Sequence, residues 1–150
     1  MRIFTYSEHI ERPREEVFAF MMDFRTAPRW RNMVRRIEVI GGGPVRQGSK
    51  LLFTMDVQGQ IKQGEVELWL YEPPHRFGQT NTRSGVTGVF EYKLEPNGTG
   101  TTVSLTADLR PHGVMWLLLP FLIRSSRLRF RDQLAKLKQA IEQERSPGKP

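Results

Sequence analysis

The hydrophobic periodicity of the chain changes once, close to residue 111, and this change constrains the fold more than any other feature. Between residues 50 and 111, apolar and polar side chains alternate along segments that turn residues separate, and the second of these segments is predicted to begin near Glu65. Such alternation is typical of half-buried strands. The connections between these segments are so short that they can join only antiparallel neighbours. The middle of the chain is therefore predicted to form an antiparallel sheet.

After residue 113 the apolar residues recur at helical spacing, which predicts one long helix that ends near Gln143. The part from Pro120 onward is about 36 Å long at the usual helical rise, comparable with the diameter of a domain of this size. Such a helix has to cross the whole sheet. Its apolar stripe consists of Leu119, Ile123, Phe130, Leu134, Leu137 and Ile141.

The first forty residues predict one strand, two short helices and a second strand. Residues 2–10 carry β-favouring side chains, and Pro13 stands at a first helical position, which favours a short helix that ends near Asp23. A second short helix is predicted to run to about Val34, and a strand follows it.

The expected fold class is α+β. A curved antiparallel sheet of about six or seven strands wraps around the long C-terminal helix, with two short helices after the first strand. We expect a single domain over residues 1–145 and a frayed tail over residues 146–150.

Composition narrows the classes of protein that remain. The chain has 150 residues, 38% of them hydrophobic, so it can bury one core. Because it contains no cysteine, disulfides and thiolate metal sites are excluded. Its longest apolar run, residues 114–123, is about half the length of a membrane-spanning helix. No secretory signal precedes the first strand, so we expect a cytoplasmic location, with peripheral membrane contact left open.

A strongly curved sheet that grips one helix leaves space on its concave side, which predicts an internal cavity. Polar residues that interrupt apolar faces, among them Glu8 and Ser126, either orient a ligand there or lie at the rim. The aromatic and aliphatic candidates either line the cavity or pack as core. The candidate ligand-binding residues are Phe20, Trp30, Phe53, Met55, Val57, Leu68, Phe77, Gln79, Asn81, Phe90, Tyr92, Leu105, Ile123, Arg127 and Phe130.

Several segments together resemble the START/Bet v 1-like superfamily, also called SRPBCC, and its polyketide cyclase/dehydrase-type branch. They are residues 12–18, Pro28 with Trp30, residues 71–74, residues 100–103 and the stripe over residues 134–141. The resemblance implies a helix-grip fold with a hydrophobic cavity that takes lipids, sterols, hormones or polyketides. Some members are cyclases, so the fold leaves the activity open, and no catalytic residue transfers to this sequence.

The function expected first is the binding or carriage of a small hydrophobic molecule that is lipid, sterol-like or aromatic polyketide-like. The alternative is a cyclase or dehydratase that uses Tyr92, Glu8 or a histidine of the cavity. His9, His75 and His112 stand in separate turns or edges, so no metal spacing exists among them. The sequence predicts neither a metal nor a cofactor, and it leaves the oligomeric state open.

The net charge of +7 suggests an acidic partner. The segment from Val114 to Lys138 is first apolar and then basic, which is typical of a segment that rests on an anionic membrane. A solvated helix face is the favoured explanation of these residues. Nucleic acid is disfavoured because no recognition helix or aromatic single-strand motif accompanies the charge. The two basic clusters are Arg25, Arg29, Arg31, Arg35 and Arg36, and then Arg124, Arg127, Arg129, Arg131, Lys136 and Lys138.

Overall fold

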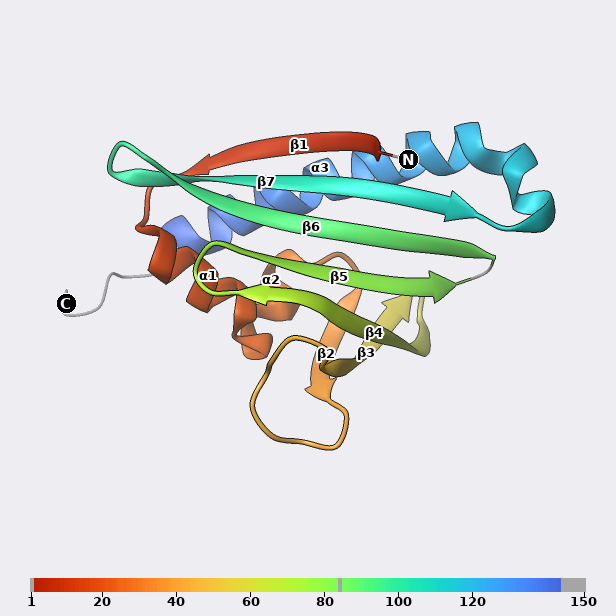
Figure 1. Cartoon of the computed structure of the whole chain (residues 1–150), viewed down its shortest axis with the longest axis horizontal. Helices are drawn as coiled ribbons and strands as arrows, with labels where there is room; N and C mark the ends of the chain where they lie inside the picture. Colours follow the sequence, from red (N-terminus) through yellow and green to blue (C-terminus); the bar gives the residue numbers. More distant parts are fainter. Residues whose placement is uncertain (1, 84, 144–150) are drawn as a thin grey trace.

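The computed structural model describes residues 2–83 and 85–143. A seven-stranded antiparallel sheet lies along one long helix, α3 (Figure 1). The strands follow the spatial order β1-β7-β6-β5-β4-β3-β2. The elements are β1 (Arg2–Ile10), α1 (Arg14–Met22), η1 (Phe24–Thr26), α2 (Ala27–Trp30), β2 (Val34–Val39), β3 (Lys50–Val57), β4 (Gln60–Glu72), β5 (Arg76–Arg83), β6 (Val86–Asn97), β7 (Gly100–Pro111), η2 (Gly113–Leu118) and α3 (Leu119–Gln143).

Each strand from β2 to β6 pairs with the strand that follows it in sequence, as short connections require, and β7 also pairs with β1. β1 and β2 are the exception, because they form opposite edges of the sheet. The short helices α1, η1 and α2 carry the chain between these edges and cover one end of the sheet (Figure 1). The predicted helix-grip fold is confirmed.

Two predicted boundaries were wrong. The second short helix ends at Trp30 and not near Val34, because Arg31 is already extended and Met33 has a φ of +64°. β4 begins at Gln60, about five residues earlier than the apolar alternation indicated. Its first residues are exposed on both faces, so they form a strand through backbone pairing with β3 and show no apolar pattern.

The core lies between the sheet and the second half of α3. Of the described residues of α3, the buried ones all follow residue 132: Gln133, Leu134, Leu137, Ala140 and Ile141. Each leucine buried in this way contributes roughly 1.5–3 kcal/mol. The first half of the helix contributes no buried residue, so the space beneath it is not closed by packing.

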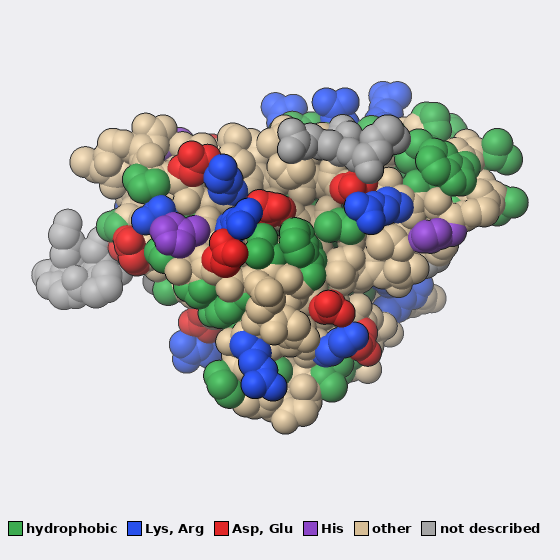
Figure 2. All heavy atoms as spheres, in the orientation of Figure 1, with side chains coloured by type: hydrophobic (Ala, Val, Ile, Leu, Met, Phe, Trp, Pro, Cys, Tyr) green, Lys and Arg blue, Asp and Glu red, His purple; other side chains and the backbone are tan. Residues whose placement is uncertain are grey.

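An exposed hydrophobic patch covers η2 and the start of α3. Figure 2 shows hydrophobic side chains gathered at this end of the molecule. The most exposed are Leu117 (82%), Val114 (78%) and Phe121 (76%). No helix in the described part of the chain is long and apolar enough to cross a bilayer. The patch, which we call the apolar patch, consists of Val114, Trp116, Leu117, Leu118, Phe121 and Leu128.

Candidate ligand-binding site

A cavity of about 390 Å³ lies between the sheet and the first half of α3. This volume falls within the range of small-molecule sites. The strands β3 to β6 supply one wall, and α3 supplies the other through Ser126, Arg129, Phe130 and Gln133. Seven of the fifteen candidate residues line it, namely Phe53, Met55, Gln79, Asn81, Phe90, Tyr92 and Phe130.

Four candidates lie in the packed core and do not reach the cavity wall: Trp30, Leu68, Phe77 and Leu105. The Phe77 ring stacks on the Tyr92 ring with 4.7 Å between centroids, and Leu134 and Leu137 pack in the same cluster. Leu68, Phe77 and Leu105 come from the sheet and Trp30 from α2, and all four are buried. The second half of α3 fills the space in front of them.

The remaining candidates lie elsewhere. Ile123 and Arg127 line a second, shallower groove together with Tyr6 and Pro120. Phe20 packs at the edge of the core under the Arg29 guanidinium, 5.3 Å from its ring centroid. Val57 ends β3 at the hairpin, and the half-buried Glu8 lines neither of these two hollows.

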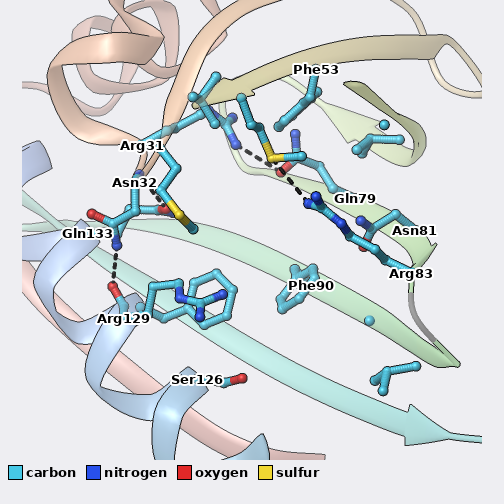
Figure 3. Close-up of a pocket in the computed structure, with 18 of the residues that line it drawn as sticks. Arg31, Asn32, Phe53, Gln79, Asn81, Arg83, Phe90, Ser126, Arg129 and Gln133 are labelled. Atoms are coloured by element: carbon cyan, nitrogen blue, oxygen red, sulfur yellow. Dashed lines mark hydrogen bonds between the residues drawn. The ribbon is translucent and has the colours of Figure 1, made fainter. Parts of the chain in front are cut away.

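The middle of the wall is apolar and aromatic. Phe90 from β6 and Phe130 from α3 have ring centroids 4.9 Å apart, so they close the cavity across the gap between sheet and helix. Phe53 and Val66 face them from β3 and β4. Figure 3 shows Phe53 and Phe90 beside the hollow, with polar side chains such as Asn81 and Gln133 around it. A mostly apolar wall with few polar groups is typical of ligand sites.

Arg31 was missed as a site residue, because the sequence placed it in a basic surface cluster. Its side chain is buried, with 6% exposed. Its Nη1 donates to the Gln79 Oε1 over 3.1 Å (Figure 3), and its guanidinium carbon lies 4.3 Å from the Trp30 ring centroid. Burial lowers the pKa of Arg31, yet an arginine stays protonated in proteins. No sequence pattern separates it from the exposed Arg29 and Arg35.

Tyr92 presents a buried phenol to the cavity. Gln133 Nε2 donates to the Tyr92 hydroxyl oxygen over 2.7 Å, and the backbone N–H of Asn32 donates to Gln133 Oε1 over 3.3 Å. Burial raises the pKa of Tyr92, while the positive charge of Arg31 and the hydrogen bond from Gln133 act in the opposite direction. The phenol therefore stays protonated near neutral pH and offers an O–H donor.

The arrangement of the titratable groups bears on whether a metal ion could bind. In the described residues, no three His, Cys, Asp or Glu side chains gather where they could hold a metal ion. His9 contacts Glu11, and His112 shares a hydrogen bond of 2.8 Å with Thr87. No histidine is among the residues that line the cavity.

A curved antiparallel sheet that holds one long helix over an apolar cavity defines the class of helix-grip ligand-binding proteins. The chain belongs to the family described as polyketide cyclase / dehydrase and lipid transport, whose model matches residues 1–142. Family and fold are thus those of the SRPBCC hydrophobic ligand-binding proteins. The predicted resemblance is confirmed.

Solved structures share this fold at low sequence identity. A START superfamily protein from Mycobacterium smegmatis is 13% identical with a TM-score of 0.73, covering 93% of this chain and 97% of that one. Ara h 8.0201 is 13% identical with a TM-score of 0.72, covering 94% and 97%. A conserved protein from Geobacillus kaustophilus is 17% identical with a TM-score of 0.71, covering 92% and 93%. No curated protein matches the sequence.

Proposed function

We propose that this protein binds and carries a small hydrophobic molecule with one or two polar groups in the cavity between the sheet and α3. Lipids, sterol-like molecules and aromatic polyketides have this character. The observation that carries the proposal is the cavity of about 390 Å³, whose apolar middle is formed by facing residues of the sheet and the helix. Burial of a ligand's apolar surface there supplies the driving force.

Binding fits the cavity better than catalysis does. A cyclase or dehydratase needs an acid or base with a suitable pKa within reach of its substrate. Of the groups predicted for this role, Tyr92 lines the cavity, whereas Glu8 and the three histidines are not among its lining residues. Because burial raises the pKa of Tyr92, its phenol can donate a hydrogen bond but is poorly suited to act as a base. The enzyme alternative therefore stays a prediction that rests on Tyr92.

The test of binding uses two neighbouring serines of α3. Ser126 is half-buried and lines the cavity, whereas Ser125 is exposed and does not. The Ser126→Phe variant should fill the cavity and reduce, by at least tenfold, the ligand that native mass spectrometry detects on protein purified from its own host. The Ser125→Phe variant is the matched control and should retain the ligand. Equal ligand content in both variants would overturn the proposal.

The apolar patch supports a second proposal, that the protein docks on an anionic lipid surface to load or release its ligand. Large contiguous exposed apolar patches on soluble domains mark interaction sites. Phe121 and Leu128 lie seven residues apart, on one face of α3, and the exposed Arg124, Arg127 and Arg131 lie beside that face. Apolar residues flanked by arginines match the interface of an anionic bilayer, because the apolar side chains insert among the lipids and the arginines are attracted to the anionic headgroups.

Vesicle flotation tests this docking. The protein should float with vesicles of phosphatidylcholine and phosphatidylglycerol, and less so as salt is raised. The double variant Leu117→Ser with Phe121→Ser should lose most of this binding. The control is Ile61→Ser, because Ile61 is also exposed (53%) but lies outside the patch. Binding that is independent of anionic lipid and salt overturns the proposal. A wild-type dimer that the double variant breaks into monomers overturns it as well, because the apolar patch would then be a dimer interface. The cytoplasmic location stays a prediction.

A further inference from the structure

One end of the cavity holds hydrogen-bond donors without acceptors. Among the described residues, Arg31 Nε and Nη2 have no hydrogen-bond partner, and neither does Gln79 Nε2. These three nitrogen atoms are closed to solvent in this structure, so a ligand in the cavity reaches them only when neighbouring side chains shift. Both side chains are buried, with 6% and 5% exposed, and both line the cavity. Figure 3 shows them pointing toward one another at the end of the cavity that Phe53 covers. A buried donor without an acceptor costs free energy, and a ligand rich in hydrogen-bond acceptors would remove this cost.

The geometry of Arg31 specifies the kind of acceptor. Nη1 is occupied by Gln79, so Nε and Nη2, which form one edge of the planar guanidinium, are the nitrogens left over. Two parallel N–H groups on one edge fit the two oxygens of a carboxylate. The plane itself is held in place, with the guanidinium carbon 4.3 Å from the Trp30 ring centroid and 5.5 Å from that of Phe53.

The charge around the cavity favours an anion as well. A buried guanidinium is normally paired with a carboxylate, but no described Asp or Glu forms an ion pair with Arg31. Arg83 and Arg129 also line the cavity, and its one acidic lining residue, Glu65, lies 3.7 Å from Lys50. The lining therefore carries three arginines against one glutamate, an excess of positive charge.

We propose that Arg31 binds the carboxylate of an amphipathic acid whose apolar body fills the rest of the cavity. Gln79 Nε2 supplies a further donor to the same carboxylate, and Phe53, Phe90 and Phe130 enclose the apolar body. The inference rests on the proposed function and narrows it, since it selects acids with an apolar chain or ring system over neutral lipids and sterols.

The probes are decanoate, decanol and acetate, and the proteins are the wild type, Arg31→Met and Arg35→Met. Arg35 is exposed on β2 and does not line the cavity, so it is the matched control. By isothermal titration calorimetry, the wild type and Arg35→Met should bind decanoate about ten- to a hundredfold more tightly than decanol. Arg31→Met should bind the two with equal affinity, and decanol as tightly as the wild type does. Acetate should bind far more weakly than decanoate, because it has no apolar body.

The outcomes separate this inference from the proposed function. If the wild type binds acid and alcohol equally, or if Arg31→Met keeps the preference for the acid, the carboxylate site is wrong while the binding cavity stands. If the wild type binds neither decanoate nor decanol, the carboxylate site is also wrong. The ligand content of the Ser126→Phe variant then decides the proposed function separately. Arg31→Lys guards against misfolding of the methionine variant. It keeps a positive charge but loses the paired edge, so it should bind decanoate with intermediate affinity.

Discussion

Arg31 carries a free-energy cost in the ligand-free protein. A charge that is taken out of water and left with one neutral hydrogen-bond partner is poorly compensated, whereas an apolar side chain of similar size in the same place is not penalised. The guanidinium of Arg31 donates to Gln79 and stacks on Trp30, and these contacts recover only part of the lost hydration. Stability and ligand binding should therefore oppose each other at this residue.

The Arg31→Met variant tests this opposition without ligand. Its free energy of unfolding should equal that of the wild type or exceed it by about 1 kcal/mol, because a poorly compensated buried charge is removed. Urea denaturation followed by circular dichroism measures the difference. Arg35→Met should change stability by no more than about 0.5 kcal/mol, as expected for an exposed side chain. A loss above about 1 kcal/mol in Arg31→Met would contradict the argument and show that its contacts outweigh its desolvation.

Tyr92 should make stability fall at high pH. Burial raises the pKa of its phenol above the ordinary value of 10.0, so in alkali the unfolded chain ionises Tyr92 while the folded chain does not. This contribution is complete below pH 10 and is lost as pH rises toward the folded pKa. Between pH 9 and 11.5, the wild type should lose stability more steeply than Tyr92→Phe, by up to about 1.4 kcal/mol per pH unit. Parallel curves for the two proteins would show that the phenol is not shielded from water.

Periodicity placed Gln79 and Asn81 as well as apolar residues on the cavity wall, but it missed Arg31. Phe53, Phe90 and Phe130 were found because strand and helix periodicity fix which side of an element faces the core. Arg31 follows the buried Trp30 directly, in a segment where the helix ends and no period applies. Its burial depends on Gln79 and Phe53, which are distant in sequence. Periodicity carries no information about such contacts.

At the scale of elements, α3 divides into two halves with different tasks. Leu134, in the second half, is 1% exposed, whereas Leu128, in the first, is 59% exposed. Leu134→Ala should therefore cost roughly 2–5 kcal/mol of unfolding free energy, and Leu128→Ala less than about 0.5 kcal/mol. Chemical denaturation of both variants measures this. Similar losses in the two would mean that the first half of α3 is also packed.

The β3–β4 hairpin offers a test of turn chemistry. Val57 pairs with Gln60, and the two residues between them, Gln58 and Gly59, have φ values of +53° and +87°. Positive φ at both positions defines a type I′ turn, which favours Asn-Gly. Gln58→Asn should raise the unfolding free energy by several tenths of a kcal/mol, and Gln58→Val should lower it by about 1 kcal/mol or more. The reverse order would contradict the assigned turn.

Most elements were predictable because their hydrophobic period is clear, and the exceptions have physical causes. The second short helix was predicted too long because nothing in its composition indicates that Met33 adopts a left-handed conformation. In the structure, the backbone N–H of Asp56 donates a hydrogen bond to the carbonyl oxygen of Met33. The start of β4 was missed because its backbone bonds to β3 stabilise residues that bury nothing. Both features depend on contacts made after the sheet has assembled.

For the whole molecule, cavity and patch follow from one asymmetry of α3. The second half is fixed by the core, and its buried residues hold it against the sheet. The first half, residues 119–132, has no buried residue. One side of it lines the cavity through Ser126 and Phe130, and Phe121 and Leu128 on the other side are exposed. A ligand that enters the cavity replaces the missing packing partner of this half, and a membrane that binds the apolar patch engages its outer side. The first half of α3 is thus where loading and docking can influence each other.

Hydrogen exchange should reveal this coupling. Without ligand, amides of residues 119–132 should exchange faster than those of residues 133–143, because fewer buried contacts oppose local opening there. Saturating decanoate should slow exchange in residues 119–132 and in β6, which face the ligand, while residues 133–143 stay unchanged. Arg31→Met should show the same two-part pattern without ligand and little protection at the same decanoate concentration. Uniform exchange along α3 would show that its two halves are equally well packed. Protection by decanoate confined to the second half would place the ligand outside this cavity. Either result would remove the link between binding and the apolar patch.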